Sequence, residues 1–193
     1  MARAIDHKDK SNEIRLRGLQ VFLRAPSQRD AQELIARNRA SVRLHRGLVL
    51  PPVNDEQFAS YLRRSRATNQ ACFMVRRIED EAIVGVMNLS EIVRGMFRSA
   101  YLGYYAVEPF AGRGYMTEGL SLVLKHAFEA LKLHRIEANI QPQNEASKAL
   151  VKRAGFKLEG YSPRYLKIAG RWRDHERWAL LVEDWKAKGR RNV

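Results

Sequence analysis

The stretch from Tyr104 to Glu118 reads YYAVEPFAGRGYMTE, and it decides the fold. A strand-like run ends near Val107, the turn Gly112-Arg113-Gly114 follows, and a helix begins after it. Glycines let a ligand approach the backbone, and the N–H groups of a helix N-terminus converge on one point. The stretch therefore predicts an anion site suited to a pyrophosphate. A plain glycine turn between strand and helix is the alternative that this stretch alone leaves open.

Apolar periodicity extends this unit toward the C-terminus. A single apolar stripe at helical spacing predicts a helix after Gly114, formed by Leu120, Val123, Leu124, Ala127, Phe128 and Leu131. Residues 135–140 then form a predicted strand, and residues 144–154 a second helix that ends at Gly155. The order strand, helix, strand requires a parallel crossover, and the carboxyl ends of two such strands frame a cleft where ligands bind.

The other segments add antiparallel strands and N-terminal helices around this crossover. Helices are predicted at 28–38 and 54–67, with a loop at 41–53 between them. The predicted strands are 19–23, 71–77, 82–92, 99–107, 157–168 and 171–181. The fold class is therefore α+β: a mixed, mostly antiparallel sheet with a central parallel strand pair and helices on both faces.

Length and composition indicate one domain. The chain has 193 residues, of which 45% are hydrophobic, enough for one sizeable core. We expect a single domain at 19–185, a basic and flexible segment at 1–18, and a basic tail at 186–193. No run approaches the ~18 apolar residues of a membrane span, which predicts a cytoplasmic protein. The single cysteine, Cys72, lies in an apolar run and is expected to be buried.

The chain is strongly basic, with a formal net charge of +14 and a pI near 10.3. Such a surface attracts polyanions, and charge alone does not choose among RNA, a ribosomal surface, an acidic protein and a phosphate-bearing cofactor. Ribosome association through this surface is one expectation. The oligomeric state stays open.

Four segments resemble the RimJ branch of the GNAT acetyltransferases in order and spacing. They are VGVMNLSEIVRGMFRSAYLGY, GRGYMTEGL, LHRIEANIQPQNEASKALVKRAGFKLEGY and GRWRDH. The likeness covers residues 71–181 well and the first seventy residues loosely. It implies the GNAT fold, acetyl-CoA as co-substrate, no metal, and transfer of the acetyl group to a primary amine. The favoured amine is the N-terminal α-amino group of a protein, with ribosomal proteins as the family precedent.

The resemblance also implies which residues hold acetyl-CoA. The strand end pairs with the pantetheine arm, the turn and helix start hold the pyrophosphate through backbone N–H groups, and an asparagine opens the next helix. The residues assigned in this way are Tyr105, Val107, Arg113, Gly114, Tyr115, Met116, Asn144 and Ser147. One position departs from the family pattern, because Ala111 stands where a glutamine or arginine is usual, which puts some affinity in doubt.

The catalytic residues are less conventional. Many family members use a tyrosine seven residues after the asparagine to protonate the leaving thiolate, and that position is Val151 here. The resemblance to RimJ and RimL sequences instead places Ser147 near the CoA sulfur. Catalytic roles are thus expected for Ser147 and Asn144, with Glu91 at a strand end as a candidate base.

Four other polar residues have a functional and a structural interpretation. Asn139 stands where some N-terminal acetyltransferases carry a glutamate base. Glu118 is a second carboxylate near the site, but an acid in a first helical turn also complements the helix dipole. His175 beside Asp174 is a further base candidate, although a paired histidine on a strand is more often structural.

Two alternative functions remain. A small-molecule amine, such as an antibiotic, amino acid or polyamine, would use the same fold, but a basic surface would repel a polyamine. A non-catalytic RNA-binding module should interleave aromatic with basic residues, and the two basic ends of the chain contain no such pattern. An α-amino group titrates near ~8 and a lysine side chain near ~10.4, which favours the protein N-terminus as acceptor.

Overall fold

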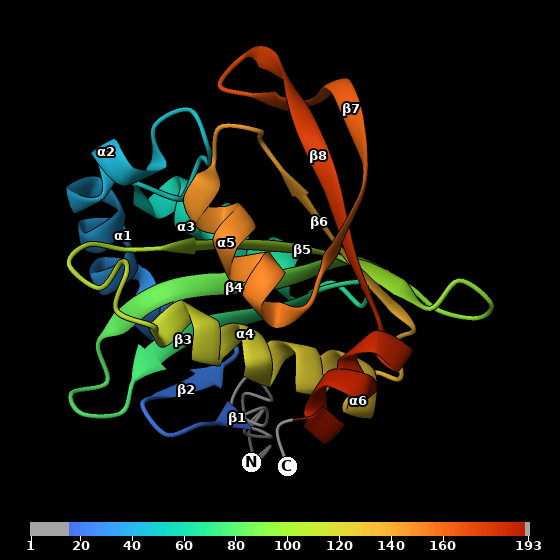
Figure 1. The fold of residues 1–193 in the computed structure, drawn as a ribbon. Helices are drawn as coiled ribbons and strands as arrows, with labels where there is room; N and C mark the ends of the chain where they lie inside the picture. The colour runs from blue at the N-terminus through green and yellow to red at the C-terminus, as the bar shows by residue number, and fades with distance from the viewer. Residues whose placement is uncertain (1–15, 192–193) are drawn as a thin grey trace, which may run out of the picture.

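A computed structural model describes residues 16–191 and shows a mixed sheet with helices on both faces (Figure 1). The strand order is β1-β2-β3-β4-β5-β6-β8-β7, and the β5–β6 pair is parallel while the neighbouring pairs are antiparallel. This arrangement confirms the predicted fold class. The strands are β1 Leu16–Arg17, β2 Val21–Arg24, β3 Ala71–Arg77, β4 Ile83–Val93, β5 Ser99–Ala106, β6 Arg135–Ile140, β7 Lys157–Ile168 and β8 Arg171–Leu181.

The helices come from both halves of the chain. The N-terminal half supplies α1 after a short 3-10 turn at Gln28–Asp30, and a π-helical turn at His126–Ala130 extends α4. The helices are α1 Ala31–Ala40, α2 Val42–His45, α3 Asp55–Ser65, α4 Tyr115–Lys125, α5 Glu145–Ala154 and α6 Val182–Arg191.

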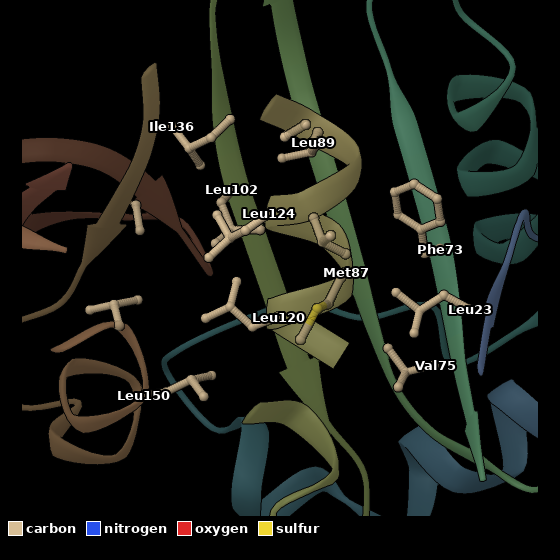
Figure 2. Packing of buried hydrophobic residues seen from close by; sticks show 14 of the residues in the cluster. Leu23, Phe73, Val75, Met87, Leu89, Leu102, Leu120, Leu124, Ile136 and Leu150 are labelled. Carbon is tan, nitrogen blue, oxygen red and sulfur yellow. The ribbon is translucent and has the colours of Figure 1, made fainter. Parts of the chain in front are cut away.

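Strand β3 explains how the sheet separates two hydrophobic layers. Its side chains alternate, so Phe73 and Val75 pack on the α4 side, whereas Cys72 and Met74 pack against α1 and α3. Because both faces are covered, β3 is nearly continuously apolar. Figure 2 shows the α4 side, where Phe73 and Val75 face the helix that carries Leu120.

The apolar stripe of α4 fixes that helix across the sheet. Five of the six residues predicted for the stripe are buried, and Leu131 packs partly buried against the same cluster. Each fully buried leucine or phenylalanine contributes on the order of 1.5–3 kcal/mol relative to an exposed one. This packing holds the N-terminus of α4 beside the end of β5.

Both predicted tails need correction where the structure describes them. Leu16 and Arg17, expected in the flexible segment, pair with Leu23 and Phe22 as strand β1, while residues 1–15 of that segment lie outside the described residues. At the other end, α6 continues through the expected tail as far as Arg191. The ring of Trp185 packs on Phe128 with 5.4 Å between centroids, which anchors α6 to the core.

Candidate active site

The central parallel strands separate after a short paired segment. Their pairing runs from Ser99 to Tyr101 on β5, after which β5 continues along β4 to Ala106 and β6 continues along β8 to Ile140. The divergence opens a cleft of about 650 Å³. The end of β5, the glycine turn, one side of α5, and α2 with the loop after it line this cleft. The structure thus brings the two predicted halves of the site together.

The register of β5 decides which of its backbone groups face the cleft. The N–H of Val107 donates to the carbonyl of Val84 over 3.1 Å, and Tyr105 pairs opposite Val86, so both residues direct their backbone groups toward β4. Because backbone groups alternate along a strand, those of Tyr104 and Ala106 face the opening. The expected backbone contacts through Tyr105 and Val107 therefore move by one residue, to Tyr104 and Ala106.

The glycine turn has the geometry of an anion site. Gly112 and Gly114 have φ angles of 77° and 87°, a left-handed conformation that favours glycine, and Gly114 is the N-cap of α4. Within the described chain, no backbone hydrogen bond uses the N–H groups of residues 113–116. Four free N–H groups at a helix N-terminus, beside the exposed guanidinium of Arg113, suit a pyrophosphate.

Two arginine side chains contact the aromatic residue that precedes this turn. Arg37 and Arg77 lie 5.0 and 5.1 Å from the ring centroid of Phe110, which is buried directly before the turn. These contacts link the residue before the turn to α1 and β3.

Helix α5 supplies the predicted polar pair on the other side of the cleft. The Asn144 side chain caps the helix by accepting from the N–H of Ser147 over 3.2 Å, and both residues line the cleft. The phenol of Tyr104 donates to the Ser147 carbonyl over 3.2 Å. Burial raises the pKa of Tyr104 to about 12, so this phenol stays protonated at neutral pH. Val151, by contrast, is fully buried in the core.

His45 is a site residue that the sequence analysis missed. It ends α2, in a segment expected to be a loop, and its Nε2 lies 2.8 Å from the carbonyl oxygen of Ala106. A carbonyl only accepts, so Nε2 carries the proton and Nδ1 has a free lone pair. Burial lowers the pKa of His45, and the ring is consequently neutral at pH 7. A histidine held against the strand that frames the cleft is placed to accept a proton.

The wall behind the cleft contains three polar atoms without a hydrogen-bond partner among the described residues. They are Asn38 Oδ1, His45 Nδ1 and Tyr105 Oη. The Tyr105 ring stacks edge-on against His45 at 5.2 Å, and burial raises its pKa, while the nearby Asn38 side chain acts on that pKa in the opposite direction. Buried polar atoms without partners are uncommon and call for an explanation.

Other lining residues were also missed. Leu44, Leu48 and Val49 come from α2 and its loop, and Arg153 comes from the last turn of α5. A sequence pattern could have predicted Arg153, because Ala146, Ala149 and Arg153 follow helical spacing on one side of α5. No comparable pattern marks the hydrophobic residues of the loop.

The two candidate carboxylates do not line the cleft. Glu91 lies near the opposite end of β4, four residues beyond Met87, which pairs with Tyr104, so it is about 13 Å away along the strand. Its carboxylate accepts from Asn69 instead. Glu118 accepts from the N–H groups of Leu19 and Gln20 and fastens α4 to the β1–β2 turn. The structure thus places Glu91 outside the cleft, where the predicted catalytic role has no geometric support.

The remaining polar candidates hold the C-terminal hairpin or β6. His175 is buried, its Nδ1 lies 3.0 Å from the carbonyl of Arg173, and burial lowers its pKa. Asp174 accepts from the Tyr161 hydroxyl and from the N–H of Arg164. Asn139 pairs opposite Arg177 on β6. None of the three predicted positions lines the cleft.

A second cavity, of about 570 Å³, adjoins the cleft and is called the side cavity below. His45 and Val49 line both spaces, so the two adjoin at these residues. Its lining residues are Asn38, Val42, His45, Arg46, Gly47, Val49, Leu50, Pro51, Pro52, Val53, Gln57, Ser60 and Arg64. No aspartate or glutamate lines either space within the described chain.

The segments that form this cleft fall largely within the part of the chain that a known family model matches. That model, described as an acetyltransferase (GNAT) domain, matches residues 20–157. The chain belongs to the GNAT acetyltransferase family. It is therefore an enzyme of acetyl transfer, as predicted, and acetyl-CoA is the acetyl donor of the fold.

Individual relatives of this GNAT enzyme include ribosomal-protein acetyltransferases. The chain is 42% identical to the [ribosomal protein uS5]-alanine N-acetyltransferase of Escherichia coli (strain K12) over 107 residues, which is 55% of this chain and 55% of that protein. The solved structure of Mycobacterium smegmatis RimJ in complex with CoA-disulfide matches with a TM-score of 0.76 and 30% identity, over 88% of this chain and 90% of that one.

A polyamine enzyme shares the GNAT fold as well. The spermidine N-acetyltransferase of Vibrio cholerae, in complex with CoA and spermine, matches with a TM-score of 0.74 over 86% of this chain and 98% of that one. At 21% identity this likeness concerns the fold alone. In the described part of this GNAT enzyme, no helix is long and apolar enough to cross a membrane, and no three His, Cys, Asp or Glu side chains gather as metal ligands.

Proposed function

We propose that the enzyme acetylates the N-terminal α-amino group of a protein, with ribosomal proteins as the favoured acceptors. One observation carries the choice of acceptor: the cleft and the side cavity have no carboxylate among their lining residues, whereas two arginines line the side cavity. A polyamine carries several positive charges and requires anionic partners, while a peptide N-terminus offers one amine followed by neutral amides.

The proposed acetyl-CoA site follows the geometry of the cleft. The N–H groups of residues 113–116 hold the pyrophosphate, supported by the positive charge of Arg113. The backbone groups of Tyr104 and the N–H of Ala106 pair with the pantetheine arm, while the Ala106 carbonyl accepts from His45 Nε2. Asn144 binds the pantetheine side of the cleft while it caps α5. The departure at Ala111 affects only a side chain, so the backbone donors of the turn are preserved.

The proposed chemistry needs a neutral amine and a proton for the thiolate. The amine nitrogen attacks the thioester carbonyl carbon, a C–N bond forms, and the C–S bond breaks. The lone pair of His45 Nδ1 accepts the proton that the amine nitrogen loses. Ser147 lines the cleft, and its hydroxyl donates a hydrogen bond to the departing sulfur while keeping its own proton. The proton that His45 takes from the amine is passed through solvent to the CoA thiolate, so the reaction neither gains nor loses a proton.

A small-molecule amine is the second acceptor class, and the fold shared with a spermidine acetyltransferase is the observation behind it. The open side cavity is larger than a single amino acid needs and contains no anionic group for a polyamine. The N-terminal peptide is therefore the better match to the charges of this site.

The test measures free thiol released from acetyl-CoA with a panel of acceptors. The panel contains hexapeptides that begin with alanine, serine or glycine, the same peptides with an acetylated N-terminus and one internal lysine, free amino acids, and spermidine. We expect turnover with the free N-terminal peptides and little with the blocked ones. Faster turnover with spermidine than with every peptide would disprove the proposal.

A further inference from the structure

The side cavity has a charge and shape that the transfer reaction alone does not require. Its apolar wall consists of Val42, Leu50 and two consecutive prolines, and Leu50 is 71% exposed. The loop is held in place, because Asn38 Nδ2 donates to the carbonyl of Pro52 over 2.8 Å and Gln141 donates to the carbonyl of Gly47. An apolar groove with a fixed wall suits an extended segment of peptide.

Two arginines give this groove a positive charge. Arg46 follows α2, and Arg64 extends from α3, where its Nη1 donates to Ser60 Oγ over 2.9 Å. Neither guanidinium group is recorded in a salt bridge among the described residues. Exposed cations without a protein counter-ion, arranged along a groove, are complementary to a carboxylate.

Asn38 and His45 contribute hydrogen-bond acceptors to the groove rather than positive charge. Asn38 is fully buried, its Oδ1 has no partner, and His45 Nδ1 beside it also has none. Both atoms are acceptors once Asn38 Nδ2 donates to Pro52 and His45 Nε2 donates to Ala106. The wall of the cavity thus contains buried hydrogen-bond acceptors, while its two guanidinium groups are exposed, and an acidic peptide with a free amine offers partners for both.

We propose that the side cavity binds the acceptor residues that follow the reacting amine, and that Arg46 and Arg64 select an acidic side chain there. This inference rests on the proposed N-terminal acetylation. The two spaces adjoin at His45 and Val49, and the proposal places the amine in the cleft and the residues that follow it in the side cavity. The enzyme then distinguishes among N-termini by charge a few residues from the reacting nitrogen.

The experiment compares matched peptides with the full-length enzyme. A series of hexapeptides that begin with alanine carries aspartate, asparagine or lysine at one of positions two to five, with all other residues neutral. At one position at least, we expect kcat/KM for aspartate to exceed that for asparagine by about threefold to tenfold, with lysine lowest. Raising the salt concentration from about 50 to 200 mM should reduce this preference, because exposed charges are screened.

Charge-reversal variants test whether Arg46 and Arg64 cause the preference for aspartate. Arg64→Glu and Arg46→Glu should each abolish or invert the preference, measured within each variant as the ratio of kcat/KM for the aspartate peptide to that for the asparagine peptide. The matched controls are Arg63→Glu, one residue along α3, and Arg43→Glu on α2, because both arginines are exposed and neither lines the side cavity. The controls should retain the parental preference.

The outcomes distinguish a failure of the acidic selection from a failure of the proposed N-terminal acetylation. Equal rates for aspartate and asparagine at all positions, or a preference that survives both reversals, would overturn the acidic selection and leave N-terminal acetylation standing. A control that loses the preference as fully as its neighbour would also overturn it, because bulk charge would then be the cause. No turnover with any peptide would refute the acetylation and the selection together.

Discussion

The hydroxyl of Tyr104 donates to the backbone carbonyl of Ser147 over 3.2 Å and joins β5 to α5 where the two halves of the cleft meet. The bond fixes the first turn of α5, and with it the direction of the Ser147 hydroxyl. The serine that we propose to interact with the sulfur is therefore held in part by a strand on the other side of the cleft.

Removal of the Ser147 hydroxyl should affect the rate more than the binding. A donor to the thiolate is stronger in the transition state than in the ground state, so we expect Ser147→Ala to lower kcat about tenfold with a smaller change in the Kd for acetyl-CoA. Tyr104→Phe should lower kcat by a smaller factor because it only loosens the helix turn. Steady-state kinetics and calorimetry check both. A parental kcat in Ser147→Ala would leave this serine with a helical role only.

Replacement of His45 tests the base. His45→Gln keeps an N–H that can donate to the Ala106 carbonyl but has no basic nitrogen, and we expect kcat to fall about a hundredfold. The pH of half-maximal rate should stay near about 8 in parent and variant, since the amine has the higher pKa of the two groups that must be unprotonated. The control is His126→Gln, another buried histidine with a lowered pKa that does not line the cleft. If His45→Gln turns over at the parental rate, or if His126→Gln loses as much, His45 is not the base.

The glycine turn can be tested with two glycines of similar backbone geometry. Gly114 and Gly95 have φ angles of 87° and 73°, and at each a new Cβ would meet no other atom within 4 Å. Aspartate at either position therefore costs similar strain, but only Gly114→Asp places a carboxylate at the anion site. Acetyl-CoA at about a hundred times its Kd stabilises a protein by about 2.7 kcal/mol. We expect the resulting rise in Tm for the parent and Gly95→Asp, and none for Gly114→Asp.

Stability should decrease in mild acid. Burial lowers the pKa values of His45, His126 and His175, so the unfolded chain binds protons more readily than the folded one as pH falls through about 6.5. Stability is present above that pH and is lost below it, by up to about 1.4 kcal/mol per pH unit for each histidine. Urea unfolding from pH 7.5 to 5 measures the slope, which His126→Phe should reduce. An unchanged slope would assign the effect to other groups.

Ribosome association is a separate prediction about the surface. The net charge of +14 should attract ribosomes, with an affinity that falls steeply between about 50 and 200 mM salt. Turnover of a neutral peptide should change little over this range. Co-sedimentation with purified ribosomes provides the measurement. Binding that is insensitive to salt would show that contacts other than charge are responsible.

Local patterns predicted much of the fold. The expected bounds of β3, β6, β7 and β8 agree with the structure, because alternation and turn residues mark strands clearly. Helix α2 was missed because a single turn is unstable alone and depends on tertiary contacts such as the His45–Ala106 hydrogen bond. The same dependence concealed His45 as a site residue.

The predicted site residues that differ from the structure depend on how strands far apart in the sequence pair with one another. Glu91 does end a strand, but its sequence position does not tell which end of the sheet opens into a cleft. The backbone groups of Tyr105 and Val107 face β4 and not the cleft, because the register with β4 decides which backbone groups are occupied, and the sequence does not show that register. The turn at 112–114 was placed correctly because its signal is local. Its role in binding acetyl-CoA remains a prediction.

The divergence of β5 from β6 gives the sheet an unpaired edge in its interior. Edges of this kind usually lie at the margin, where they attract other strands and promote aggregation. Here α5 on one side and α2 on the other restrict access, so only a slender chain with amide groups of its own can complete the ladder. A bound pantetheine arm would act as the missing strand. Binding of the arm should slow hydrogen exchange at the amides of Tyr104 and Ala106, and its release should restore the faster exchange. The edge of β5 would then be paired and unpaired once in each catalytic cycle.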